Sequence, residues 1–241
     1  MWSIETLESS ALGRIAVPPF IPAGFSVFCT TLDFDGRLSE DRARLLTDFV
    51  RERSGIESAL ATCTQVHGVT AHRAIRDGSW RECDSCDALW ADERNVSLAI
   101  KIADCLPVSM IDPTHAVTAN IHSGWRGAAQ GITAATLDAI SRESAFDPAA
   151  SFAYLGPSIR VCCFEVGEEV AAQFDARYID RTHAKPHVDL VAFTTDILRA
   201  HGFDAGRISD SELCTRCDGS VFHSYRREGK GGGRNLQVVA M

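Results

Sequence analysis

Three short segments place reactive side chains next to apolar runs. They are Thr64-Gln65-Val66-His67-Gly68, Ala103-Asp104-Cys105-Leu106-Pro107 and His122-Ser123-Gly124-Trp125-Arg126-Gly127. Polar residues at strand ends that lead into loops are typical of reactive sites in α/β folds. The two imidazoles and the thiolate of His67, Cys105 and His122 form a three-ligand set with a fourth position open, which is the pattern of a catalytic zinc site.

The spacing and chemistry of these ligands narrow the choice of metal. The ligands are too far apart in sequence for a zinc finger, whose ligands come from short loops, so we expect them to come from separate strands. Thiolate and imidazole favour zinc or copper over magnesium or calcium. Zinc is the better prediction, because the methionines are poorly placed to give the weak axial ligand of a blue-copper site. The alternative is that the histidines are ordinary polar residues and Cys105 is a small buried hydrophobe.

The elements that would position these side chains are visible as apolar patterns. Helical spacing is found over residues 39–50 with Ser39 as the N-cap, 132–140, 166–178, and 190–198 with a stop at Gly202. Short apolar runs predict strands over residues 25–29, 96–102, 108–111, 116–121, 152–155, 221–225 and 236–240. Interleaved strands and helices predict an α/β fold, a layered sandwich of mixed sheets in a single domain over residues 1–241.

The composition excludes several classes of protein. The chain has 241 residues, 45% of them hydrophobic, and a net charge of −8 from 24 basic and 32 acidic residues. This predicts a globular protein that needs no disulfide to fold. The acidic balance argues against a nucleic-acid partner but not against a local basic pocket. Because we find no secretory signal and no membrane-length apolar run, we expect a cytoplasmic protein with reduced thiols and no membrane partner.

The three segments and two further ones resemble the YfiH family of laccase-domain proteins. TQVHG, ADCLPV and HSGWRG occur in the family order, followed by GPSI and CCFEVG within 156–167, by CTRCDGSVFHSYRRE at 214–228 and by GRN at 233–235. The resemblance covers residues 60–241. It implies a zinc ion held by the residues that match His67, Cys105 and His122. It also implies an α/β sandwich similar to the catalytic domain of a bacterial deamidating toxin.

The resemblance also implies an activity on purine nucleosides. Expected reactions are zinc-dependent phosphorolysis of adenosine, inosine, guanosine or methylthioadenosine, and deamination of adenosine. The partners would be a purine nucleoside and phosphate. The protein itself would be a monomer or a small homo-oligomer. Asp104 is a candidate for proton transfer or for orienting a ligand, with a turn or capping carboxylate as the alternative. Arg42, Arg126 and Arg226 are candidates for phosphate binding, or else form structural ion pairs.

The N-terminal region departs from the family pattern. Members usually carry a T-R-x-G-G-V-S loop and then an S-L-N-L-G stretch before an N-R helix. Here Leu32 stands where the family arginine would be, the S-L-N-L-G stretch is absent, and Asp41 precedes Arg42 in place of Asn. If that loop binds substrate, we expect weaker activity or an altered specificity.

Three other functions remain open. A copper-dependent polyphenol oxidase, the family's older description, needs several coppers and more histidines than this set supplies. A cysteine hydrolase would use Cys105 as the nucleophile and His122 or His67 as the base. That chemistry, or a metal-dependent one, would fit an amidohydrolase that edits a cell-wall precursor, a role to which family members have been linked. The third is a non-catalytic nucleoside- or metal-binding protein.

Two C-x-x-C pairs lie outside the three segments. Cys83 with Cys86 and Cys214 with Cys217 could together hold a structural zinc or act as redox pairs. The long gap between the pairs disfavours a shared metal, so we expect the second pair to belong to a local turn and leave the first unexplained. If Cys162 and Cys163 lie on a strand, their side chains point to opposite faces.

Overall fold

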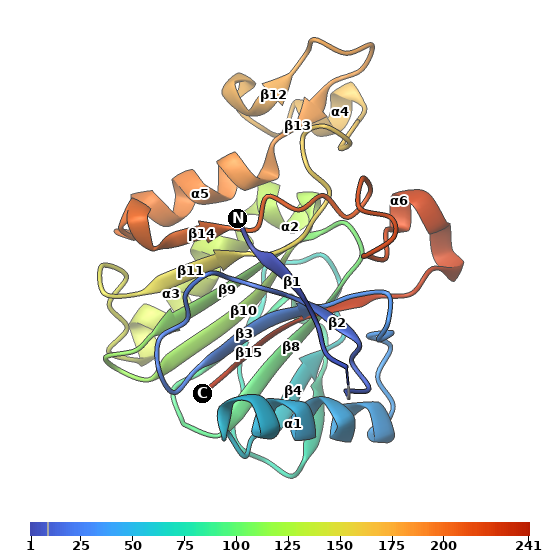
Figure 1. Ribbon diagram of the computed structural model, residues 1–241. Coiled ribbons are helices and arrows are strands. Elements are labelled where there is room, and N and C mark those ends of the chain that lie inside the picture. Colours follow the sequence, from blue (N-terminus) through green and yellow to red (C-terminus); the bar gives the residue numbers. More distant parts are fainter. Residues whose placement is uncertain (9) are drawn as a thin grey trace.

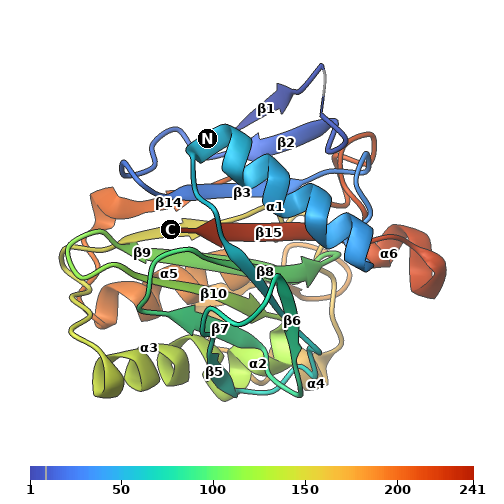
Figure 2. The same cartoon turned by 90° about the horizontal axis from the view of Figure 1, so that it is seen from below.

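Two β-sheets pack face to face in the computed structural model, which describes residues 1–8 and 10–241 (Figures 1 and 2). The seven-stranded sheet has the order β1 (Ser3–Thr6), β2 (Arg14–Val17), β3 (Ser26–Thr30), β15 (Asn235–Ala240), β8 (Val96–Ile102), β4 (Ala59–Cys63) and β6 (Trp80–Cys83). The six-stranded sheet has the order β14 (Ile208–Asp210), β11 (Phe152–Leu155), β9 (Leu106–Asp112), β10 (Val117–Ser123), β7 (Ala88–Ala91) and β5 (Ala71–Arg73). A separate two-stranded ribbon consists of β12 (Ile179–Asp180) and β13 (His187–Val188).

The helices lie outside the pair of sheets. They are α1 (Glu40–Ser54), α2 (Trp125–Gln130), α3 (Ile132–Glu143), α4 (Glu168–Ala171), α5 (Leu190–Ala200) and α6 (Tyr225–Glu228), with 3₁₀ turns at Ala176–Tyr178, Ala205–Arg207 and Gly229–Gly231. Both sheets contain parallel and antiparallel pairs, since β4 runs parallel to β8 and β14 runs parallel to β11. The fold is therefore a mixed α/β sandwich, as predicted. No helix in the described part of the chain is long and apolar enough to span a membrane.

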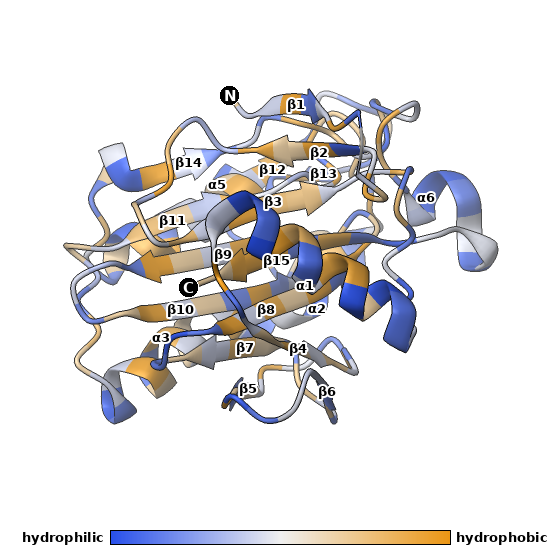
Figure 3. Cartoon of the chain, turned by 60° about the horizontal axis from the view of Figure 1, so that its bottom comes forward, coloured by the Kyte–Doolittle hydropathy of each residue, from blue (hydrophilic) through white to orange (hydrophobic). Residues whose placement is uncertain are grey.

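Apolar side chains fill three layers of the sandwich. Helix α1 covers the outer face of the seven-stranded sheet, where Leu46 and Phe49 pack with Phe28. Figure 3 shows polar and apolar residues alternating around α1, as expected for a helix with one buried face. The interface between the sheets is filled by residues such as Leu98 and Ile100 of β8.

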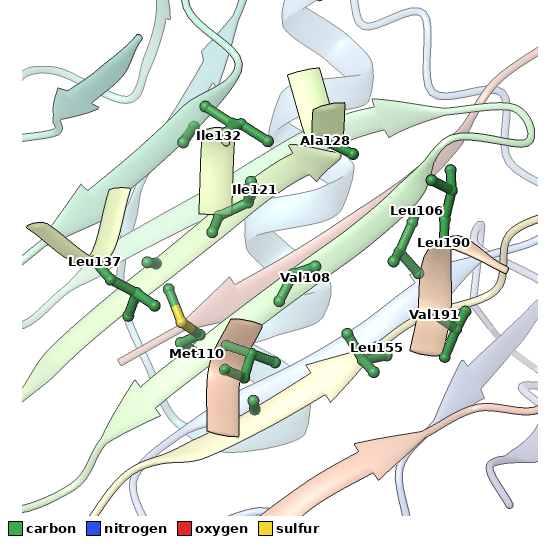
Figure 4. Packing of buried hydrophobic residues seen from close by; sticks show 14 of the residues in the cluster. Leu106, Val108, Met110, Ile121, Ala128, Ile132, Leu137, Leu155, Leu190 and Val191 are labelled. Carbon is green, nitrogen blue, oxygen red and sulfur yellow. The ribbon is translucent and has the colours of Figure 1, made fainter. Parts of the chain in front are cut away.

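The outer face of the six-stranded sheet carries the largest layer. Val108 and Met110 of β9 pack against helices α3 and α5 (Figure 4). Ala128 of α2 also belongs to this cluster. Because α2 begins directly after β10, its packing on the sheet fixes the direction in which the chain leaves that strand.

Most predicted elements are confirmed, but two are wrong. Residues 221–225 form a turn, in which the N–H groups of Val221 and Phe222 donate to the carbonyl of Asp218. Phe222 is fully buried between the sheets, so this apolar run reflects burial and not strand structure. The helix predicted over 166–178 is broken into α4 and a 3₁₀ turn, which Asp175 caps by accepting from the N–H of Arg177.

Candidate metal centre

The predicted ligands His67, Cys105 and His122 come together at one end of the sandwich. Cys105 lies between β8 of one sheet and β9 of the other, and His122 lies near the end of β10. Strands β9 and β10 are antiparallel with His122 opposite Pro107, which brings the end of one strand to the start of the other. His67 lies in the loop after β4. The three donor atoms all lie within 4.8 Å of one another, and the Cys105 Sγ–His67 Nε2 distance is 3.9 Å.

Asp87 connects two of the ligands, and sequence reasoning missed it. Its fully buried carboxylate accepts hydrogen bonds from the backbone N–H groups of Val66, His67 and Gly68, over 3.1, 2.9 and 2.7 Å. The same carboxylate accepts from Nδ1 of His122 over 2.8 Å. A carboxylate on Nδ1 fixes the tautomer of a ligating histidine and leaves Nε2 free for a metal. The only signal in the sequence is an aspartate just before a short apolar run.

The backbone near the site is strained at two non-glycine positions. His67 has a φ of 61° and Asp104 a φ of 87°, in the left-handed region that costs most side chains about 1–2 kcal/mol. Asp87 holds the His67 loop in this conformation. Asp104 is held through both carboxylate oxygens, which accept from Thr215 Oγ1 and from the backbone N–H of Arg226, each over 2.7 Å.

The space between the ligands depends on a glycine. A Cβ atom added to Gly124 would lie 3.0 Å from both Cys105 Sγ and His67 Cδ2. Contacts this short require a neighbour to move, so only glycine fits without displacing the ligands. The donor set, the fixed His122 tautomer and this open space together fit a tetrahedral metal ion with one exchangeable position.

The charge state of the site suits metal binding. Burial raises the pKa of the Cys105 thiol, but the neighbouring His122 and His67 lower it by more, so that the net pKa is about 6. Burial lowers the pKa of His122, whereas Cys105 and Asp87 raise it to about 9. Without a metal, therefore, the thiolate faces a protonated imidazole. A metal would replace that proton, because a metal ligand must be a thiolate or a neutral imidazole.

A cleft of about 880 Å³ opens beside the three ligands. Three of its lining arginines each lie over an aromatic ring, with guanidinium-to-centroid distances of 4.5, 5.9 and 5.9 Å. These pairs are Arg126 with Trp125, Arg226 with Phe164, and Arg234 with Tyr225. None of the three arginines forms an ion pair with a carboxylate of the described residues, so their charges are free to meet an anion.

The structure brings most of the predicted site residues into this cleft. Asp104, Arg126 and Arg226 line it with the three candidate ligands. Arg42 does not line it, since its guanidinium donates to the carbonyl of Arg37 over 3.0 Å and lies 3.9 Å from Asp35. Sequence reasoning did not select Arg234, although it stands within the GRN stretch.

The contacts of Asp104 are those of a structural carboxylate. Both of its carboxylate oxygens are occupied as hydrogen-bond acceptors, and its carbonyl accepts from the N–H of Ile159 over 2.8 Å. It therefore joins the Cys105 turn to Thr215 and to the start of α6. The turn-carboxylate alternative explains these contacts better than proton transfer does.

The structure also tests the predictions for the other cysteines. Cys83 and Cys86 are buried between the sheets and do not meet the second C-x-x-C pair. Cys162 and Cys163 lie in a turn, so their side chains do not point to opposite faces as on a strand. Both sulfurs instead approach Cys217.

Comparisons with known proteins agree with this architecture. A family model described as multi-copper polyphenol oxidoreductase laccase matches residues 28–241. A purine nucleoside phosphorylase of Pseudomonas aeruginosa is 33% identical over 209 residues, which cover 83% of this chain and 80% of that protein. An adenosine deaminase from an unknown prokaryotic organism is 33% identical over 164 residues, covering 65% of this chain and 62% of that protein. The chain thus spans less than two thirds of the length of that relative.

Solved structures share the fold. YlmD from Geobacillus stearothermophilus has a TM-score of 0.80 at 23% identity, with 98% of both chains covered. YfiH from Bacillus licheniformis has a TM-score of 0.79 at 24% identity, covering 90% of this chain and 92% of that one. On the family-model match over residues 28–241, the chain belongs to the YfiH family of laccase-domain proteins.

Proposed function

We propose that this protein is a zinc-dependent enzyme that cleaves purine nucleosides with phosphate and also deaminates adenosine. The observation that carries the proposal is a His-Cys-His donor set in the wall of a cleft whose three arginines form no ion pair with the described carboxylates. The named activities of the two relatives, phosphorolysis and deamination, support the choice of substrate. Bound zinc would act as a Lewis acid toward phosphate or water, lowering the pKa of that water to about 7.

The cleft offers groups for both parts of the substrate pair. Guanidinium groups bind phosphate through two parallel hydrogen bonds, so Arg126, Arg226 and Arg234 suit a phosphate co-substrate. Trp125 and Tyr225 line the cleft and are at least partly exposed, so a purine can stack on the ring face that the neighbouring arginine does not cover. The position of Arg226 depends on Asp104, which accepts from its backbone N–H. Arg42 is left out of this phosphate-binding set.

The two reactions differ in the bonds that form and break, but they use the same metal centre. In phosphorolysis, a phosphate oxygen bonds to the ribose anomeric carbon while the bond to the purine nitrogen breaks, and the purine takes up a proton. In deamination, a water oxygen bonds to the purine carbon that carries the amino group, and ammonia leaves. Asp87 serves both reactions by holding His122 and the His67 loop in the geometry that binds the ion.

Product analysis from adenosine tests the proposal. Zinc-replete protein is incubated with adenosine with and without phosphate, and the products are separated by chromatography. We expect free adenine and ribose 1-phosphate only with phosphate, and inosine in either case. Absence of all three products would refute the proposed function. A protein that carries copper and oxidises phenols would favour the oxidase alternative.

A cysteine hydrolase is the second candidate, because one observation favours it. The pKa values of about 6 for Cys105 and about 9 for His122 describe a thiolate–imidazolium pair, as in cysteine nucleophiles. Cys105 would attack an amide carbonyl, forming a thioester as the amine leaves. Retained amide hydrolysis after complete zinc removal would favour this candidate. Protection of Cys105 from alkylation until a chelator removes the ion would favour the zinc enzyme.

A further inference from the structure

Four cysteines form a second sulfur-rich site outside the candidate metal centre. Their Sγ atoms all lie within 4.8 Å of one another. The measured pairs are 3.4 Å for Cys163–Cys217 and 3.8 Å for Cys162–Cys217. We call this set the thiol cluster, which consists of Cys162, Cys163, Cys214 and Cys217.

The sulfur separations match ligands around one ion better than a disulfide. A disulfide needs sulfurs about 2.05 Å apart. Tetrahedral zinc with Zn–S bonds of about 2.3 Å places its sulfurs about 3.8 Å apart. The measured 3.4 and 3.8 Å lie near the second value, so the thiol cluster already has roughly the size of a four-sulfur zinc site.

The backbone presents the sulfurs from two turns. In the first turn the N–H of Cys163 donates to the carbonyl of Arg160 over 2.8 Å, which lets neighbouring cysteines face one point. In the second turn the N–H of Asp218 donates to the carbonyl of Cys214 over 2.9 Å. The C-x-x-C spacing of that turn is common in structural zinc sites.

Backbone N–H groups from both turns are directed at the sulfur of Cys214. They belong to Arg160, Arg216 and Cys217. N–H groups directed at a buried sulfur stabilise its anionic form, which is the form that binds a metal.

We propose that the thiol cluster binds a structural zinc ion, distinct from the ion assigned to His67, Cys105 and His122. Four thiolates are soft ligands that select zinc over magnesium or calcium. All four coordination positions would come from the chain, so the site is closed and takes no substrate. Cys162 and Cys217 are exposed, which gives the ion a path into the site.

The zinc would fix one wall of the cleft. It would join two segments, one of which continues into Phe164, a residue of the cleft wall. The other segment contains Thr215, whose hydroxyl donates to Asp104 beside Cys105. Cys163 and Cys217 are 54 residues apart in the sequence, so the ion would cross-link distant parts of the chain at this wall.

Metal content of purified protein tests the proposal. The Cys162→Ser/Cys217→Ser double variant removes the two exposed ligands, and Cys83→Ala is a control that removes a buried thiol elsewhere. We expect the double variant to hold one zinc per chain fewer than the wild type, and the control to hold the wild-type amount. This difference is independent of whether the candidate metal centre is occupied. Equal zinc in the wild type and the double variant would overturn the proposal.

Alkylation of the native wild-type protein gives a readout that needs no variant. In zinc-replete protein the exposed Cys162 and Cys217 should resist iodoacetamide, and they should react after a chelator removes the ion. X-ray absorption at the zinc edge should find about 2.5 sulfurs per zinc when both sites are filled, against about one in the double variant. Immediate alkylation of both cysteines, or a disulfide within the thiol cluster, would overturn the proposal.

Discussion

Replacing Asp87 by Asn tests how the candidate metal centre is held together. One carboxylate oxygen accepts from the N–H of His67 and from His122 Nδ1, and the other accepts from the N–H groups of Val66 and Gly68. An amide keeps one oxygen and turns the other acceptor into an NH₂ donor. In either orientation of the amide, two donors would face that NH₂ group.

The structure sets the size of the effect. Each buried donor left without an acceptor costs about 1–3 kcal/mol, so two cost about 2–6 kcal/mol. We expect Asp87→Asn to lower the free energy of unfolding by about 3 kcal/mol. Partners that orient metal ligands typically contribute 10–100-fold in metal affinity, or about 1.4–2.8 kcal/mol. We expect a loss of zinc affinity in that range.

The assay is competition for zinc with a chromophoric chelator at fixed pH, together with denaturant unfolding. Asp84→Asn is the matched control, because Asp84 is exposed and lies three positions earlier. The control should keep wild-type affinity and stability. If folded Asp87→Asn protein bound zinc within about twofold of wild type, the role given to Asp87 would be refuted.

Three further predictions concern the space between the metal ligands, the binding of phosphate and the stability of the protein at low pH. Gly124→Ala places a Cβ 3.0 Å from Cys105 Sγ and should weaken zinc binding at least about tenfold, as the same competition assay would detect; unchanged affinity would disprove the steric argument. Arg126→Ala should raise the KM for phosphate about tenfold, while the exposed Arg142→Ala should not; equal KM values would exclude this phosphate contact. Burial raises the pKa of Asp112, but three backbone N–H groups and an imidazole lower it below its ordinary value of 3.8. The ionised carboxylate therefore stabilises the folded protein above about pH 4, and this contribution is lost as the pH falls through the pKa of the folded state. Asp112→Asn should therefore flatten the fall of stability between about pH 5 and pH 2 in denaturant titrations, and an unchanged slope would contradict the assignment.

The sequence was sufficient to find the candidate metal ligands. His67, Cys105 and His122 each follow or adjoin an apolar run, and the structure places all three together. The strand over residues 96–102 was predicted with its exact bounds. A buried strand that ends in a turn is visible in the sequence as an apolar run followed by turn-forming residues.

Residues whose roles depend on contacts between distant parts of the sequence could not be predicted. Asp87 matters because its carboxylate receives backbone N–H groups some 20 positions away, and no local pattern encodes that. Arg234 lines the cleft only because the fold brings its segment there, which the local sequence does not indicate. The two halves of the thiol cluster are separated by about 50 residues, so their approach was hidden for the same reason.

Apolar periodicity was misleading where buried residues lie in irregular structure. Val166, Val170, Phe174 and Tyr178 are all buried at four-residue spacing, yet the chain over them is not one helix. Capping by Asp175 starts a new turn within that stretch. Periodicity in this segment reports which side chains are buried, but not whether the backbone is continuous.

The most direct test of the account compares zinc-replete wild type with His122→Ala in adenosine phosphorolysis. His122 is a proposed ligand whose ring is fixed by Asp87, so its removal should empty the centre and leave the cleft arginines in place. We predict a loss of at least about 100-fold in the phosphorolysis rate, beyond the effect of losing an outer partner. Phosphorolysis at the wild-type rate in His122→Ala would contradict the claim that a metal at His67, Cys105 and His122 is needed for the reaction.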